Sequence, residues 1–105
     1  MNRHSLLLVD DDARFCRALT LVLEKEGHRV VAVHTASDAV AAVHGSTAYD
    51  LVLLDMMLPD NDGMECLAEL KSLSLELPVI IITGEATVTT YIPHFAGALR
   101  RVFVG

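Results

Sequence analysis

LVLLDMMLPDNDG, residues 51–63, joins an uninterrupted apolar run to an acidic loop. Three similar apolar runs occur at residues 6–9, 30–33 and 79–82. All four are continuous rather than alternating, which is expected of parallel strands that are buried on both faces of a sheet. The stretch therefore predicts a buried strand at 51–54 that is followed at once by Asp55.

Segments with helical spacing separate these runs. Between residues 13 and 26, Phe15, Leu19 and Val22 fall at i, i+4 and i+7, and Gly27 then supplies a C-terminal cap. Thr35 opens a second helix with a capping-box-like start. That helix ends before Gly45.

A third helix is predicted over residues 63–73, where Met64, Leu67 and Leu70 share one face, and Pro78 opens the next strand. Because strands and helices alternate, we predict an α/β fold with a doubly wound parallel sheet.

The pattern weakens after residue 83. A fourth helix should occupy residues 86–99, but residues 88–92 are rich in β-branched side chains. Pro93 would also break an interior helix at a cost of about 3 kcal/mol. The last apolar run, residues 102–104, is predicted to be a fifth strand.

Composition narrows the class of protein. The 105 residues predict one domain, 1–105, with a single core. The net charge of −6 argues against direct nucleic-acid binding, which needs clustered Lys and Arg. No apolar run approaches the roughly 20 residues of a membrane span, and no signal peptide is evident. We therefore expect a cytoplasmic protein, with Cys16 and Cys66 as reduced thiols and the histidines at surface or strand-edge positions.

Acidic side chains follow two of the predicted strands. Asp10, Asp11 and Asp12 follow the first strand, Asp55 follows the third, and Thr83 follows the fourth. Ligands bind beyond the carboxyl ends of such strands. Carboxylates this close would repel one another unless a cation neutralised them, and hard oxygen ligands favour Mg²⁺. One carboxylate would then be free to attack phosphorus; Asp12 is better interpreted as a helix N-cap.

These residues carry a resemblance to a family. Residues 9–12 (VDDD), 55–63 (DMMLPDNDG) and 82–84 (ITG) closely resemble the receiver domains of two-component response regulators. The resemblance covers residues 5 to about 86. It implies a flavodoxin-like fold, with five parallel strands in the order 2-1-3-4-5.

The resemblance also implies roles for individual residues. Asp55 would be the phosphoacceptor. Asp11 and Asp55 would bind Mg²⁺ directly, Asp10 through water, and Met57 through its main-chain carbonyl. Thr83 would be the switch hydroxyl that contacts the phosphoryl group. The phosphodonor would be a sensor histidine kinase, so the chain would be a signalling module rather than a turnover enzyme. Its motifs look like those of regulators of transcription.

One part of the family pattern is absent from the sequence. Receiver domains carry a lysine at the end of the fifth strand, near residue 105 by spacing, but no lysine follows Lys71. Arg100 and Arg101 are better interpreted as surface charge. The fifth helix is also missing, so we expect a receiver that is incomplete at its C-terminus. A homodimer formed through this region, or a marginally stable fold, would follow from the exposed apolar surface.

Two alternatives compete with a phosphoacceptor. A pseudo-receiver would keep the fold as an interaction module without a phosphorylation cycle, as the absent lysine suggests. A Mg²⁺-dependent phosphatase of the haloacid-dehalogenase type would need a second Asp two residues after the nucleophile, where this chain has Met57.

Overall fold

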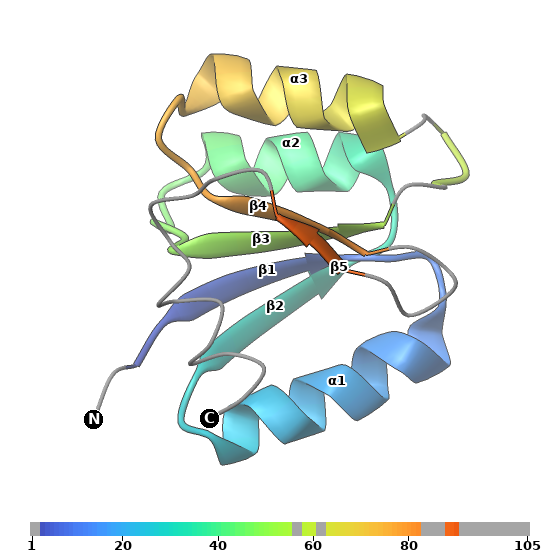
Figure 1. The fold of residues 1–105 in the computed structure, drawn as a ribbon, viewed down its shortest axis with the longest axis vertical. Helices are drawn as coiled ribbons and strands as arrows, with labels where there is room; N and C mark the ends of the chain where they lie inside the picture. Colours follow the sequence, from blue (N-terminus) through green and yellow to red (C-terminus); the bar gives the residue numbers. More distant parts are fainter. Residues whose placement is uncertain (1–2, 56–57, 61–62, 83–87, 91–105) are drawn as a thin grey trace.

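The computed structural model describes residues 3–55, 58–60, 63–82 and 88–90. Strands and helices alternate along most of this length, as predicted (Figure 1). The elements are β1 (Ser5–Val9), α1 (Ala13–Lys25), β2 (Arg29–Val33), α2 (Ala36–His44), β3 (Leu51–Asp55), α3 (Gly63–Leu73), β4 (Val79–Ile82) and β5 (Val88–Thr90).

The strands form one sheet in the order β2-β1-β3-β4-β5. The first four strands are parallel, which confirms the predicted order for this part of the fold. Helices α2 and α3 lie on one face of the sheet and α1 on the other (Figure 1). All carboxyl ends of the parallel strands therefore meet at one edge of the molecule.

The fifth position of the sheet differs from the prediction. It is filled by Val88–Thr90, which pairs antiparallel with β4, so neither an all-parallel sheet nor a helix over 88–90 is correct. The physical reason is twofold: β-branched residues favour a strand, and only five residues separate β4 from β5, whereas a parallel crossover needs a dozen or more. The predicted strand at 102–104 lies outside the described residues.

The core consists of two layers that share the strands. Alternate residues of each buried strand point to opposite faces, which is why the apolar runs are continuous. Towards α1 lie Leu6, Leu8, Leu51, Leu53, Ile80 and Ile82. Towards α2 and α3 lie Leu7, Val9, Val52, Leu54, Val79 and Ile81. The edge strand β2 is the exception, because three of its five residues are exposed and the other two are half-buried.

Helix α1 buries a face that overlaps the predicted one only at Leu19. Its buried residues are Cys16 and Leu23, with Leu19 partly buried between them. Phe15 is 37% exposed and Val22 is 58% exposed, so the predicted stripe is displaced by one position around the helix.

Helix α3 shows a similar displacement. It buries Leu67 and Leu70 as predicted, but Cys66 is buried in place of Met64, which is 46% exposed. Both cysteines are free and buried, in agreement with their interpretation as reduced thiols. No helix in the described part of the chain is long and apolar enough to span a bilayer.

Candidate metal site

The register of the sheet brings two acidic residues together. Val9 of β1 is paired with Leu54 of β3, so Asp10 and Asp55 are opposite one another one position further along. Asp10 is two positions after Leu8, and Asp55 is two positions after Leu53. Residues two apart on a strand point to the same face, and Leu8 and Leu53 face α1. Both aspartate side chains therefore emerge on the same side of the carboxyl edge.

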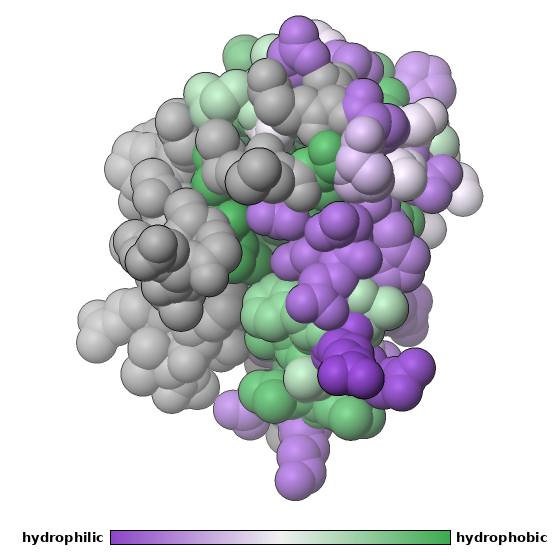
Figure 2. Space-filling model, turned by 90° about the vertical axis from the view of Figure 1, so that its right-hand side faces the viewer, coloured by the Kyte–Doolittle hydropathy of each residue, from purple (hydrophilic) through white to green (hydrophobic). Residues whose placement is uncertain are grey.

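Asp11 completes a group of three carboxylates. One carboxylate oxygen from each of Asp10, Asp11 and Asp55 lies within 4.8 Å of the others. Asp10 is buried, Asp55 is half-buried and Asp11 is exposed. Figure 2 looks onto this edge and shows hydrophilic residues across the middle of the face. The structure thus brings together three of the residues predicted to bind a metal.

The electrostatics of Asp10 fit a cation. Burial raises the pKa of the Asp10 carboxyl, and the negative charges of Asp55, Asp11 and Asp12 raise it further, against a hydrogen bond from the Asp12 N–H that lowers it. That bond measures 2.9 Å from the Asp12 nitrogen to Oδ1 of Asp10. A hard divalent cation such as Mg²⁺ would relieve the repulsion while accepting oxygen ligands, so the donor set fits the predicted metal.

The main chain at Asp10 is held from two sides. Nδ1 of His34 lies 2.8 Å from the carbonyl oxygen of Asp10 and donates to it. The Cys16 thiol donates to the same oxygen at 3.4 Å. This burial, with the nearby aspartates, raises the pKa of Cys16 to about 11, so the thiol stays protonated and keeps its donor role.

The start of α1 is fixed as expected. Asp12 is its N-cap and accepts from the N–H groups of Arg14 and Phe15 at 3.0 and 3.1 Å. The interpretation of Asp12 as a cap is therefore confirmed. Its carboxylate is committed to the helix, which leaves Asp10 and Asp11 for the acidic group.

The loop after β3 is tied to a helix that lies far away in the sequence. Asp60 accepts hydrogen bonds from the N–H groups of Ala36 at 2.8 Å and Ser37 at 3.0 Å, in the first turn of α2. These bonds lower the pKa of the Asp60 carboxyl. Beside them is a shallow hollow of about 220 Å³ lined by Ala36, Ser37, Val40, Asp60 and Glu69. This tie was not predicted from the sequence.

Two predicted site residues cannot be placed. Met57 and Thr83 lie outside the described residues. Their suggested roles, and the direct role of Asp55 as phosphoacceptor, remain predictions.

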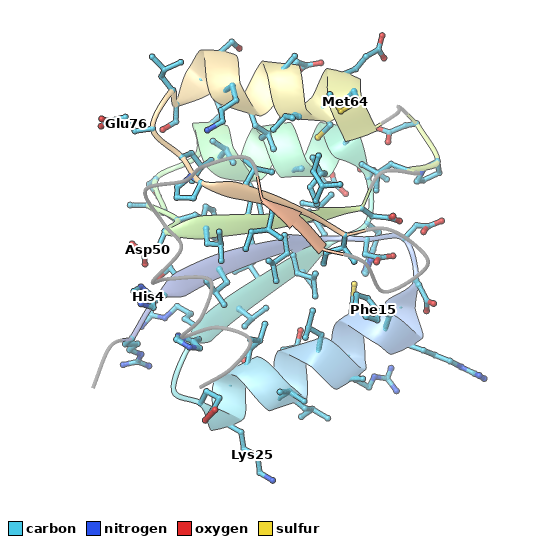
Figure 3. The ribbon with its side chains drawn as sticks, viewed as in Figure 1. His4, Phe15, Lys25, Asp50, Met64 and Glu76 are labelled. Carbon is cyan, nitrogen blue, oxygen red and sulfur yellow. The ribbon has the colours of Figure 1, made fainter. Side chains whose placement is uncertain are left out.

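A second polar cluster lies at the opposite end of β1, and it was not predicted. The rings of His4 and His28 stack with centroids 5.4 Å apart, and the His4 N–H donates to Nδ1 of His28 at 3.2 Å. Asp50 lies beside them, 3.9 Å from Nδ1 of His4 (Figure 3). His28 is buried directly before the edge strand β2, so of the two expected positions, surface or strand edge, the surface is wrong for this residue. An isolated histidine after a helix-ending glycine gives no sequence signal of burial.

Comparison with known proteins supports the same interpretation. The family model of the response regulator receiver domain matches residues 6–98. Transcriptional regulatory protein TcrA of Mycobacterium tuberculosis is 39% identical over 92 residues, 88% of this chain and 36% of its own length. The uncharacterised transcriptional regulatory protein YkoG of Bacillus subtilis is 37% identical over 89 residues, 84% of this chain and 38% of its own length. The chain thus spans under two fifths of these relatives.

Solved structures agree with the sequence relatives. A CheY-like receiver domain protein from Methanospirillum hungatei superimposes with a TM-score of 0.75 at 31% identity, covering 82% of this chain and 68% of that chain. The non-phosphorylated HemR receiver domain from Leptospira biflexa gives 0.71 at 32% identity, covering 80% and 67%. With its sheet order and acidic edge, the chain belongs to the response regulator receiver domain family.

Proposed function

We propose that this chain is a phosphorylation-dependent signalling switch that accepts a phosphoryl group on Asp55 from a sensor histidine kinase in the cytoplasm. The observation that carries the proposal is the meeting of Asp10, Asp11 and Asp55 at the carboxyl edge of the sheet. The half-buried Asp55 stands at the end of β3, where its carboxylate is reachable from outside while the strand behind it is fixed between β1 and β4.

The proposed reaction is a simple displacement at phosphorus. An oxygen of the Asp55 carboxylate attacks the phosphorus of a phosphohistidine and forms an acyl phosphate. The P–N bond breaks, its electron pair stays on the imidazole nitrogen, and that nitrogen takes up a proton from water. Asp10 and Asp11 would hold the metal that this charge-dense step requires.

The acidic group supports a requirement for Mg²⁺. When bound, Mg²⁺ would neutralise the charge that develops on the transferred phosphoryl group. Asp11 and Asp55 would bind it directly and Asp10 through water. In this chain the His34 and Cys16 hydrogen bonds hold the Asp10 backbone in place, so the end of β1 that carries Asp10 is fixed before the donor arrives.

Intact-mass measurement after incubation with acetyl phosphate and Mg²⁺ tests the proposal. We expect one added phosphoryl group in the parent chain, and none in Asp55→Ala or when Mg²⁺ is removed with a chelator. Circular dichroism of each sample establishes that it is folded. A folded parent that binds Mg²⁺ but takes up no phosphoryl group would contradict the proposal and favour the pseudo-receiver, the alternative suggested by the lack of any lysine after Lys71.

A further inference from the structure

We infer that Asp60 is a positioning residue that anchors the loop after the phosphoacceptor to the first turn of α2. The inference rests on the proposed function, since it assigns Asp60 to the loop that starts at Asp55. Asp60 is five positions beyond Asp55 and is exposed, yet its carboxylate is hydrogen-bonded to another part of the protein. Both of its oxygens accept hydrogen bonds from α2.

The partners of Asp60 make this an anchor and not a local turn. The N–H groups of Ala36 and Ser37 belong to the first turn of a helix, where backbone donors have no intrahelical acceptor. An ionised acceptor there is favoured by the positive end of the helix dipole. Each bond spans more than twenty positions of sequence, so the pair ties two separate segments together.

The helix that receives the anchor is itself rigidly placed. Ala36 and Ala39 of α2 are buried against the sheet, and Thr35 caps the helix by accepting from the Asp38 N–H at 3.0 Å. Directly before Thr35, His34 donates to the carbonyl oxygen of Asp10. The corner from His34 to Ser37 is therefore bonded to both sides of the acidic group: to the end of β1 through His34, and to the loop after β3 through Asp60.

Thr35 provides a matched control for this inference. Thr35 and Asp60 both satisfy N–H groups in the first turn of α2, and only Asp60 connects that turn to the loop. Thr35→Ala removes a cap and leaves the connection. Asp60→Ala removes the connection, and Asp60→Asn removes the charge while keeping a carbonyl oxygen that can accept.

The experiment compares these three variants with the parent chain. Urea unfolding gives stability, calorimetric titration with MgCl₂ gives metal affinity, and intact mass over time with acetyl phosphate gives the phosphorylation rate. For Asp60→Ala we expect at least a threefold loss in both Mg²⁺ affinity and rate at 0.3 M salt, where charge effects are screened. Thr35→Ala should stay within twofold of the parent in both. Asp60→Asn keeps one of the two acceptor oxygens, so both values for this variant should fall between those of the parent and those of Asp60→Ala.

Two results would overturn the inference. One is an Asp60→Ala chain that is folded and within twofold of the parent in Mg²⁺ affinity and rate. The other is Thr35→Ala losing as much as Asp60→Ala, which would show that only the stability of α2 matters. If the parent itself takes up no phosphoryl group, the proposed function fails, while the Mg²⁺ titration still decides whether Asp60 positions the acidic group.

Discussion

Asp11 is the exposed member of the group formed by Asp10, Asp11 and Asp55. Its charge is expected to lower the stability of the fold without metal and to raise it when a metal is bound. In the absence of Mg²⁺ it repels the buried Asp10; under the proposed function it would be a ligand when Mg²⁺ is bound. We predict that Asp11→Asn raises the melting temperature without Mg²⁺ by about 2–4 °C, and abolishes most of the rise that Mg²⁺ gives the parent chain through linkage. Scanning calorimetry without Mg²⁺ and with about 10 mM Mg²⁺ measures both effects. This concentration is chosen to exceed the dissociation constant of the metal, as stabilisation by a bound ligand requires.

Asp12→Asn is the control for that prediction. Asn caps helices as well as Asp does, so this variant also removes one charge but leaves the acidic group intact. It should keep the stabilisation by Mg²⁺. An Asp11→Asn chain that is stabilised by Mg²⁺ as strongly as the parent would show that Asp11 does not bind the metal.

His28 gives the fold a defined response to acid. Burial, helped by the nearby His4, lowers the pKa of His28 below its usual value of 6.5. Between these two pKa values the unfolded chain binds more protons than the folded chain, so the His28 contribution to stability is complete above pH 6.5 and is lost as the pH falls towards the folded-state pKa. We expect the free energy of unfolding to fall by up to about 1.4 kcal/mol per pH unit from this group.

Urea unfolding between pH 4.5 and pH 8 tests this response. His28→Asn keeps an acceptor for the His4 N–H but cannot titrate, so its stability should fall less steeply than that of the parent below pH 6.5. His44 is exposed at the end of α2, and His44→Asn should leave the slope unchanged. Equal slopes in the parent and His28→Asn would refute the prediction.

At the scale of elements, the end of α1 depends on one glycine. Gly27 has φ = 95°, its N–H donates to the Glu24 carbonyl at 2.9 Å, and the His28 N–H donates to the Leu23 carbonyl at 3.1 Å. These two bonds form a Schellman motif. Gly27→Ala places a Cβ in the left-handed region and should cost about 1 kcal/mol of unfolding free energy.

The second helix supplies the comparison for Gly27. Gly45 also ends a helix, but with φ = −75°, and a Cβ there would meet its nearest neighbour, the Ala42 carbonyl oxygen, at an ordinary 3.4 Å. In urea titrations Gly45→Ala should therefore cost clearly less than Gly27→Ala. Equal costs would mean that the backbone at Gly27 is not the source of the effect.

Elements could be predicted from the sequence wherever local pattern and tertiary packing agree. The four continuous apolar runs predicted the parallel strands, whereas their order was implied by the resemblance to receiver domains. Asp12, Thr35 and Gly27 marked helix ends correctly. The buried face of α1 was wrong because Phe15 and Val22 fit helical spacing as well as Cys16 and Leu23 do. Only the position of the sheet decides between the two faces.

The remaining features depend on contacts between distant segments. The strand at 88–90 forms because β4 has an open edge. The tie from Asp60 to α2 and the burial of His28 join residues more than twenty positions apart. Asp10, Asp11 and Asp55 could be predicted to meet, once β1 and β3 are taken as neighbours, because all three stand at strand ends and strand ends are marked in the sequence. No pattern in the sequence indicates which backbone groups Asp60 binds.

At the scale of the whole molecule, the two polar clusters lie at opposite ends of the same strand, β1. The acidic group lies beyond the carboxyl end of β1, and the pair formed by His4 and His28 lies at its amino end, beside Asp50 (Figure 3). The five residues of β1 lie between His4 and Asp10, which places these two residues about 20 Å apart at about 3.3 Å per residue. Sites beyond 7–10 Å with no shared partner usually act independently.

This separation predicts additive stability effects across the sheet. In urea unfolding at pH 7 without Mg²⁺, the free-energy changes of Asp11→Asn and His28→Asn should add in the double variant to within about 0.5 kcal/mol. His4→Gln with His28→Asn is the matched pair in contact, because their rings stack and the His4 N–H bonds to His28, and that pair should deviate from additivity. A coupling above about 1 kcal/mol between Asp11 and His28 would instead mean that β1 transmits strain between its ends, because neither side chain can reach the other directly.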